Sequence, residues 1–228
     1  ALWFDLLLKV GASEFLGYSI ETAEGQVVAL VVDGAEVDIA GPGTEVSVIT
    51  NQTPFYGESG GQTVDAGRIW MPEGFEFAVE TTNKPLGRLH THVGRITGGS
   101  VKVGDAVHLE VDAERRDRIR ANHSATHLVH AALRNRLGDH VTQKGSLVSE
   151  DRFRFDFSHP KPLGDDDIAA IEVEVNEEIR QLIASGADAG QLKSKARESE
   201  MMTLQKDAMR HVADGTTSLE ELQRAFKS

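Results

Sequence analysis

Three histidines lie at helical spacing in the segment NHSATHLVHAALRNRLG, residues 122–138: His123, His127 and His130. On a helix, side chains four positions apart have Cβ atoms about 5–6 Å apart, so His123 and His127 can share one metal ion. Two histidines do not complete a zinc site, because a catalytic zinc usually takes three protein ligands and a structural zinc four. The alternative is a polar helix side whose histidines meet only solvent and neighbouring side chains.

The composition limits what could complete such a site. The chain has 228 residues and no cysteine, so disulfides, thiolate nucleophiles and sulfur ligands are excluded. The remaining candidate ligands are His140, His159, His211 and Asp156, and none of them makes a second pair by spacing. A metal site in this chain would therefore consist of histidine, carboxylate and water.

Charge and hydropathy limit the class of protein. The net charge of −12 argues against broad, non-specific binding of nucleic acid, although it leaves a short contact with an RNA end open. A hydrophobic content of 39% is enough for a folded core. No segment approaches the roughly 20 apolar residues that span a bilayer, and the first residues lack a signal-peptide pattern. We therefore expect a cytoplasmic protein that does not associate with membranes.

A glycine-rich segment, TPFYGESGGQTVDAGRI at residues 53–69, is the second stretch with potential chemistry. Gly60 and Gly61 permit a close backbone approach, which leaves amides available to a ligand carboxylate, phosphate or ribose. A wide hairpin whose glycines serve only the turn is an equal alternative. No GK[ST] follows, so the segment is not a nucleotide-binding loop.

The hydrophobic pattern predicts an α+β protein in four segments. Residues 1–16 indicate a short N-terminal helix that ends at Gly11. Residues 17–112 hold short β-branched runs, such as QVVALVV and TEVSVIT, separated by turn residues about every 8–12 positions, which is typical of a small antiparallel barrel. Residues 113–184 read as helix, strands and a second helix behind Asp165. Residues 185–228 are charged and read as a helical appendage.

Several motifs together resemble the editing domain of bacterial alanyl-tRNA synthetase, over about residues 1–181. They are TPFYGESGGQTVDAGRI, VGRITGGSVKVGDAVHLEVD and ANHSATHLVHAALRNRLGDHVTQKGSLVSEDRFRFDFSH. The resemblance implies a deacylase that removes wrongly attached serine or glycine at the acceptor end of tRNA(Ala). It also implies zinc as cofactor, held by a histidine pair like His123 and His127 and completed by a later Cys and His.

The resemblance implies roles for further residues. The expected site residues are Thr126 and Gln143 as catalytic residues that contact substrate or water, and Gly60, Gly61 and Gln62 as substrate-binding residues of the same cleft. Zinc would help to position water at an ester that is already activated for hydrolysis.

The sequence departs from that family in its last part. It has no cysteine, so half of the expected zinc site is missing and we expect impaired hydrolysis. The tail, chiefly MTLQKDAMRHVADGTTSLEEL, resembles the C-terminus of the ATPases of type II secretion and type IV pilus assembly, without a nucleotide-binding motif. This tail is a candidate oligomerisation surface. The alternatives are a non-catalytic module that binds the tRNA end and an engineered or rearranged fusion fragment without activity.

Overall fold

The computed structural model describes residues 2–57 and 61–184, and the chain divides into two compact units, residues 1–117 and 118–228. The sequence analysis placed a boundary between residues 112 and 113. The expected helical appendage at residues 185–228, with its oligomerisation role, lies outside the described residues. None of the helices in the described ranges has the length and apolarity needed to cross a membrane.

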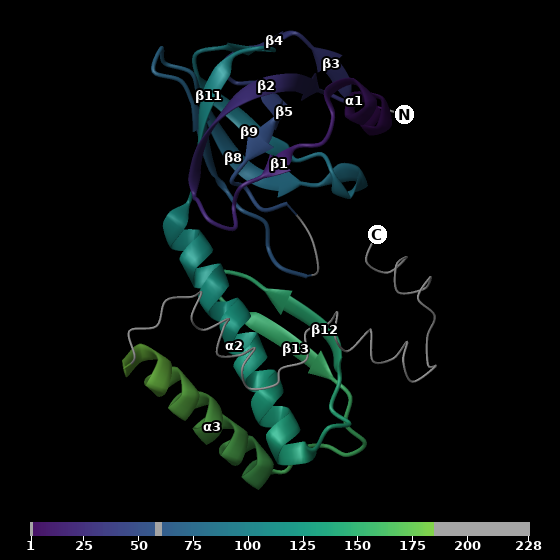
Figure 1. Ribbon diagram of the computed structural model, residues 1–228, viewed down its shortest axis with the longest axis vertical. Coiled ribbons are helices and arrows are strands. Elements are labelled where there is room, and N and C mark those ends of the chain that lie inside the picture. Colours follow the sequence, from purple (N-terminus) through teal and green to yellow (C-terminus); the bar gives the residue numbers. More distant parts are fainter. Residues whose placement is uncertain (1, 58–60, 185–228) are drawn as a thin grey trace. The chain divides into compact units, whose positions relative to one another are not determined.

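Six antiparallel strands form a closed β-barrel in the first unit (Figure 1). They follow one another around the ring in the order β11, β7, β8, β9, β5 and β2, and β2 pairs with β11 to close it. The strands are β2 (Thr22–Val32), β5 (Glu45–Thr50), β7 (Gly67–Trp70), β8 (Glu76–Asn83), β9 (Thr91–Gly98) and β11 (Ala106–Val111). The predicted α+β class with an antiparallel barrel is confirmed.

Several short strands and a 3₁₀ turn accompany the six strands of the barrel. Strand β3 (Ala35–Val37) extends the sheet from β2, and β4 (Ile39–Ala40) pairs with β10 (Val101–Lys102). Strand β1 (Glu14–Phe15) runs parallel to β6 (Gln52–Thr53), and a 3₁₀ turn, η1 (Pro85–Gly87), precedes β9. The glycine-rich segment therefore connects β6 to β7, as the sequence predicted for a segment between strands.

Two hydrophobic cores lie on opposite faces of the barrel wall. Inward-facing side chains fill the barrel, among them Phe55, Ile69, Phe75, Phe77 and Leu109. The N-terminal helix α1 (Leu2–Val10) ends directly before Gly11, as predicted, and covers a second core of Leu6, Ala29, Val31, Ile49 and Leu89. Strand β2 serves both cores because successive side chains point to opposite faces of a strand: Leu30 belongs to the barrel interior and Ala29 and Val31 to the core beneath α1.

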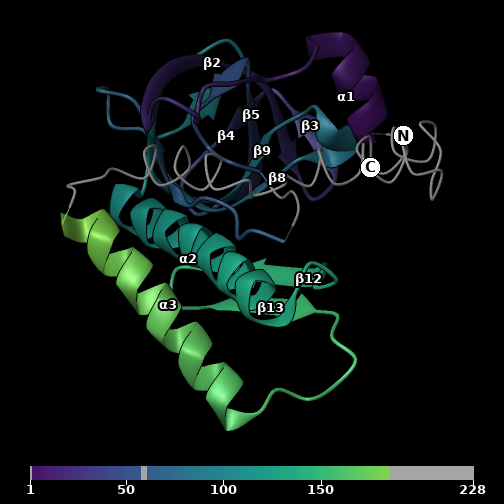
Figure 2. The same ribbon diagram turned by 60° about the horizontal axis from the view of Figure 1, so that its bottom comes forward.

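The second unit contains a hairpin and two helices. The helix α2 (Ala113–Leu137) begins in the first unit and continues into the second. The predicted strands are β12 (Gln143–Val148) and β13 (Phe153–Phe157), which form a hairpin, and α3 (Asp165–Ala184) begins with the predicted acidic turn. The hairpin and α3 lie on different sides of α2 (Figure 1, Figure 2). The buried core of this unit consists of Ala132, Leu133, Val141 and Ile171.

A buried ion pair attaches the start of α2 to the barrel. Asp112 caps the helix, because its carboxylate accepts a hydrogen bond from the backbone N–H of Arg115 at 2.9 Å. One turn further, the guanidinium of Arg116 binds the carboxylate of Asp65 and donates to the carbonyl oxygen of Pro54 at 2.6 Å. The side chains of Arg116 and Asp65 are 6% and 5% exposed. The backbone N–H of Tyr56 also donates to Asp65, at 2.7 Å, so the carboxylate is enclosed by donors.

We expect Arg116→Met to lower the free energy of unfolding by about 3–5 kcal/mol, because it leaves the Asp65 carboxylate buried without its cation. Methionine keeps most of the apolar stem and removes the charge. The matched control is Arg68→Met, which removes an exposed ion pair with Glu110 and should cost less than about 1 kcal/mol. Urea unfolding at neutral pH measures both values, and equal losses in the two variants would contradict the structural role of Arg116.

Candidate functional site

The predicted histidine pair is brought together on α2. The rings of His123 and His127 stack with their centroids 5.0 Å apart, and both side chains are exposed. His130 is half-buried, and its ring lies 5.0 Å from that of Phe155 in the hairpin, so it contributes to packing. In the described part of the chain, no group of three histidine, aspartate or glutamate side chains could hold a metal ion. Zinc binding by His123 and His127 stays a prediction.

The two expected catalytic side chains occupy different environments in the second unit. Thr126 is 5% exposed, and its hydroxyl donates to the carbonyl oxygen of Asn122 at 2.9 Å. The carboxamide of Asn122 in turn donates to the carbonyl oxygen of Ser149 at 2.8 Å. Gln143 is exposed at the start of β12, paired with Phe157 of β13. The hydroxyl of Thr126 therefore donates its proton to a backbone carbonyl of its own helix. The catalytic roles of Thr126 and Gln143 stay predictions.

The three residues expected to bind substrate lie in the segment between β6 and β7. Gly60 is outside the described residues. Gly61 has φ +80°, a left-handed conformation that favours glycine, and Gln62 follows it in an isolated β-bridge. These residues belong to the first unit and the histidine pair to the second. Their expected common cleft stays a prediction.

Two buried histidines in β9 and its approach escaped the sequence analysis. His92 is 0% exposed, and its Nδ1 lies 2.8 Å from the carbonyl oxygen of Val48. A carbonyl can only accept, so Nδ1 carries the proton and Nε2 accepts from the Thr53 hydroxyl at 2.7 Å. The same hydroxyl accepts from the backbone N–H of Phe55 at 3.0 Å. This network is satisfied only with a neutral imidazole, and burial lowers the pKa of His92 to about 4.

His90 is buried in a more apolar setting. Its ring stacks on Phe15 with centroids 5.5 Å apart, and its Nδ1 has no hydrogen-bond partner among the described residues. Burial, with smaller effects of the charge of Lys84 and of His92, lowers the pKa of His90 to about 4. Neither His90 nor His92 is placed to meet a ligand, and we interpret both as structural.

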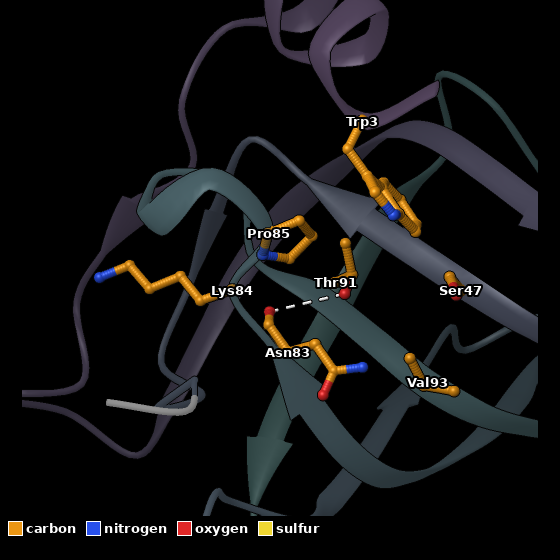
Figure 3. A pocket seen from close by; sticks show the side chains of 7 residues that line it. All are labelled: Trp3, Ser47, Asn83, Lys84, Pro85, Thr91 and Val93. Atoms are coloured by element: carbon orange, nitrogen blue, oxygen red, sulfur yellow. Dashed lines mark hydrogen bonds between the residues drawn. The ribbon is translucent and has the colours of Figure 1, made fainter. Parts of the chain in front are cut away.

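A hollow on the barrel lies beside α1 and has a volume of about 380 Å³ (Figure 3). It is lined by Trp3, Ser47, Asn83, Lys84, Pro85, Thr91 and Val93. The Lys84 side chain points away from Trp3, and the Thr91 hydroxyl is directed to the carbonyl oxygen of Asn83 at 3.5 Å. The hollow therefore gathers no set of converging charged groups, and we assign no site to it.

A local excess of positive charge marks the second unit. Residues 118–161 contain eight Lys and Arg against four Asp and Glu, a net charge of +4 inside a chain of −12. This segment includes α2 after its first turn and the whole hairpin. Exposed cations lie on the hairpin at Lys144, Arg152 and Arg154. The sequence analysis missed this feature because the net charge of the whole chain conceals it.

Two arginines of α2 share a face with the histidine pair. Arg120, His123, His127 and Arg134 follow one another at three-, four- and seven-residue steps, which place them along one side of a helix. Arg134 is tied to Asp139 at 2.9 Å. The exposed cations of the hairpin are the stronger indication of a nucleic-acid contact, because a nucleic-acid contact depends on clustered Lys and Arg.

Residues 5–115 match the family model for tRNA synthetases class II (A). The chain is similar to one segment of alanine-tRNA ligase. It is 64% identical over 180 residues to the ligase of Rhizorhabdus wittichii, 64% over 179 residues to that of Sphingopyxis alaskensis and 58% over 181 residues to that of Parvibaculum lavamentivorans. These matches cover 78–79% of this chain and 20% of each ligase, so the chain spans about a fifth of the length of these relatives.

The family match contradicts the expected identification as an editing domain. The class II (A) model covers the barrel and includes the glycine-rich segment, one of the motifs on which the resemblance rested. The expected hydrolysis of serine or glycine from mischarged tRNA(Ala), and its impairment by a missing half of the zinc site, are withdrawn with that identification. Motifs at matching spacings do not by themselves define a reaction. The similarity to a secretion-type ATPase concerned the tail, which lies outside the described residues.

The two buried histidines make the fold sensitive to acid. A histidine in an unfolded chain titrates near pH 6.5. Between about pH 6.5 and about pH 4, His90 and His92 therefore bind protons in the unfolded chain but stay neutral in the folded chain. The free energy of unfolding should therefore fall as pH decreases through this window, by up to about 3 kcal/mol for each histidine.

His90→Phe tests this dependence, because a phenyl ring keeps the stacking on Phe15 and removes the titrating group. We expect the variant to be at least as stable as the parent at neutral pH and to lose less stability at acidic pH, as measured by urea unfolding over the same window. His108→Phe, which makes the same substitution at a half-exposed histidine of β11, is the control for the change of side chain. Parallel pH profiles of the parent and His90→Phe would show that His90 does not contribute.

Proposed function

We propose that this chain is a segment of an alanine-tRNA ligase and that its residues 118–161 contact tRNA(Ala). The observation that carries the proposal is the 64% identity over 180 residues to the ligase of Rhizorhabdus wittichii. The local charge of +4 in a chain of −12 supports the location of the contact. The complete ligase would attach alanine to its tRNA, and this segment would contribute binding of the RNA.

The charge distribution supports an oriented contact. RNA phosphates are repelled by the acidic remainder of the chain, including the acidic first turn of α3 at Asp165, Asp166 and Asp167. They are attracted by the hairpin, because exposed Lys and Arg neutralise phosphate and release counterions. An acidic protein with one basic segment binds RNA in few orientations. This restriction suits a segment of a ligase that must hold tRNA in a defined orientation.

The elements also suit this role mechanically. The base of the hairpin is joined by a hydrogen bond between the hydroxyls of Thr142 and Ser158 at 2.7 Å, and Phe155 packs against His130 of α2. Phosphate contacts position an RNA, and they need side chains on rigid elements. Binding at the acceptor end of tRNA(Ala) stays a prediction, as does a cytoplasmic location.

We expect the double variant Lys144→Ala/Arg152→Ala to bind tRNA(Ala) more weakly and with a smaller salt dependence. Each lost phosphate contact should reduce the slope of log affinity against log salt concentration by about 1. Fluorescence anisotropy of labelled tRNA(Ala) at several salt concentrations measures both quantities.

The matched control is Arg88→Ala/Lys102→Ala, which removes two exposed cations from the barrel unit. It changes the net charge by the same amount and should leave the affinity close to that of the parent. Equal weakening in the two double variants would mean that charge alone matters and that residues 118–161 form no specific contact. Absence of any binding at low salt would contradict the proposed function itself.

A further inference from the structure

We propose that His140 and His159 form a binding site for one divalent transition-metal ion of the copper and nickel class. The sequence offered no second histidine pair, because these residues are 19 positions apart. The fold brings Nε2 of His140 to 2.9 Å from Nδ1 of His159, with the ring centroids 5.1 Å apart. His140 is exposed and His159 half-exposed, so an ion can reach both. Both residues lie within residues 118–161, but metal binding by the pair does not require the proposed contact with tRNA.

The donor atoms indicate the class of ion. Imidazole nitrogens suit zinc, copper, iron and nickel, and the affinity of a given site for divalent first-row metals rises from Mn²⁺ to Cu²⁺. The 2.9 Å between the two nitrogens is a hydrogen-bond distance, and the rings must rotate to direct both lone pairs at one ion. Cu(II) and Ni(II) accept nitrogen and oxygen ligands in square-planar and tetragonal sites. Water would fill the remaining positions, because the pair faces solvent.

The hairpin holds the two histidines in place before any ion arrives. His140 precedes β12 and His159 follows β13, so they flank the base of the hairpin. Next to them, the backbone N–H of Ser158 donates to the carbonyl oxygen of Thr142 at 3.0 Å, and the two hydroxyls are hydrogen-bonded. Because the backbone is already ordered, an ion need not supply the energy to bring its ligands together.

The turn after α2 also favours this position of His140. Gly138 has φ +110°, a conformation that favours glycine, and a Cβ at this position would lie 3.2 Å from Nδ1 of His140. A side chain here would strain the turn and press against the imidazole. The carboxylate of the intervening Asp139 is bound by Arg134 at 2.9 Å, so we do not count it as a ligand. The protein ligands are the two imidazoles.

Proton positions are consistent with this site. Without an ion, one ring N–H donates to the lone pair of the other ring. To bind an ion, both facing nitrogens must offer lone pairs, so the donating ring moves its proton to its other nitrogen. Two neutral histidines can do this with no net release of protons and no redox step. A bound ion would replace one weak hydrogen bond at the base of the hairpin with two coordinate bonds.

The test is a titration of the full chain with nickel chloride, followed by isothermal titration calorimetry near neutral pH. The protein carries no polyhistidine tag and is first stripped with EDTA. We expect the parent to bind nickel at this pair, and both His159→Gln and His140→Gln to bind it at least about tenfold more weakly, because a single imidazole lacks the chelate effect. Glutamine can still hydrogen-bond to the remaining histidine, so the variants separate metal binding from the hydrogen bond.

Two controls define the outcome. His108→Gln, in the barrel, should bind nickel like the parent, and His123→Gln/His127→Gln should retain the site while testing the separate pair on α2. The proposal is overturned if the parent binds no nickel, if both glutamine variants at 140 and 159 bind like the parent, or if only the His123/His127 variant loses binding. Melting temperatures without metal report the fold, and whichever single variant is folded decides the result.

Discussion

The buried pair of Asp65 and Arg116 is the interaction on which the barrel unit most depends. It joins both ends of the glycine-rich segment to α2, because Arg116 in the first turn of α2 binds the carboxylate of Asp65 and also the carbonyl oxygen of Pro54. Burial of two charges is favourable only when every donor and acceptor is used. Here the backbone N–H of Tyr56 and the guanidinium together enclose the carboxylate. The pair therefore specifies how the glycine-rich segment folds back on the barrel.

Regular elements were predictable because they leave a periodic pattern. Alternating β-branched residues gave the barrel, and the apolar and acidic spacing gave α1, α2 and α3. Closure of the ring by β2 and β11 left no such pattern, because their register, Ala106 opposite Gln26, is a contact between residues 80 positions apart. For the same reason, the pairing of Asp65 with Arg116 could not be predicted from the sequence. Their pairing follows from the closed barrel, and neither residue is unusual in its local sequence.

The candidate site shows a similar division. The i, i+4 spacing correctly placed His123 beside His127, since both lie on one helix. Spacing could not predict that His140 lies beside His159, because they are separated by a hairpin whose register cannot be read from the sequence. The family resemblance supplied a reaction as well as residues, and the reaction was wrong. Local spacing constrains which side chains meet, whereas a reaction depends on everything around them.

Strand β2 contributes side chains both to the core inside the barrel and to the core between the barrel and α1. It is 11 residues long and pairs with β11, β5 and β3, so a shift of one residue would disturb three ladders at once. Such a shift would also exchange faces: Leu30 would leave the barrel interior and Val31 would enter it from beneath α1. The packing of α1 therefore favours the observed register, because the helix finds its apolar partners only when β2 presents Ala29 and Val31 outward. A helix of nine residues thus adds to the specificity of a strand pairing in which it takes no part.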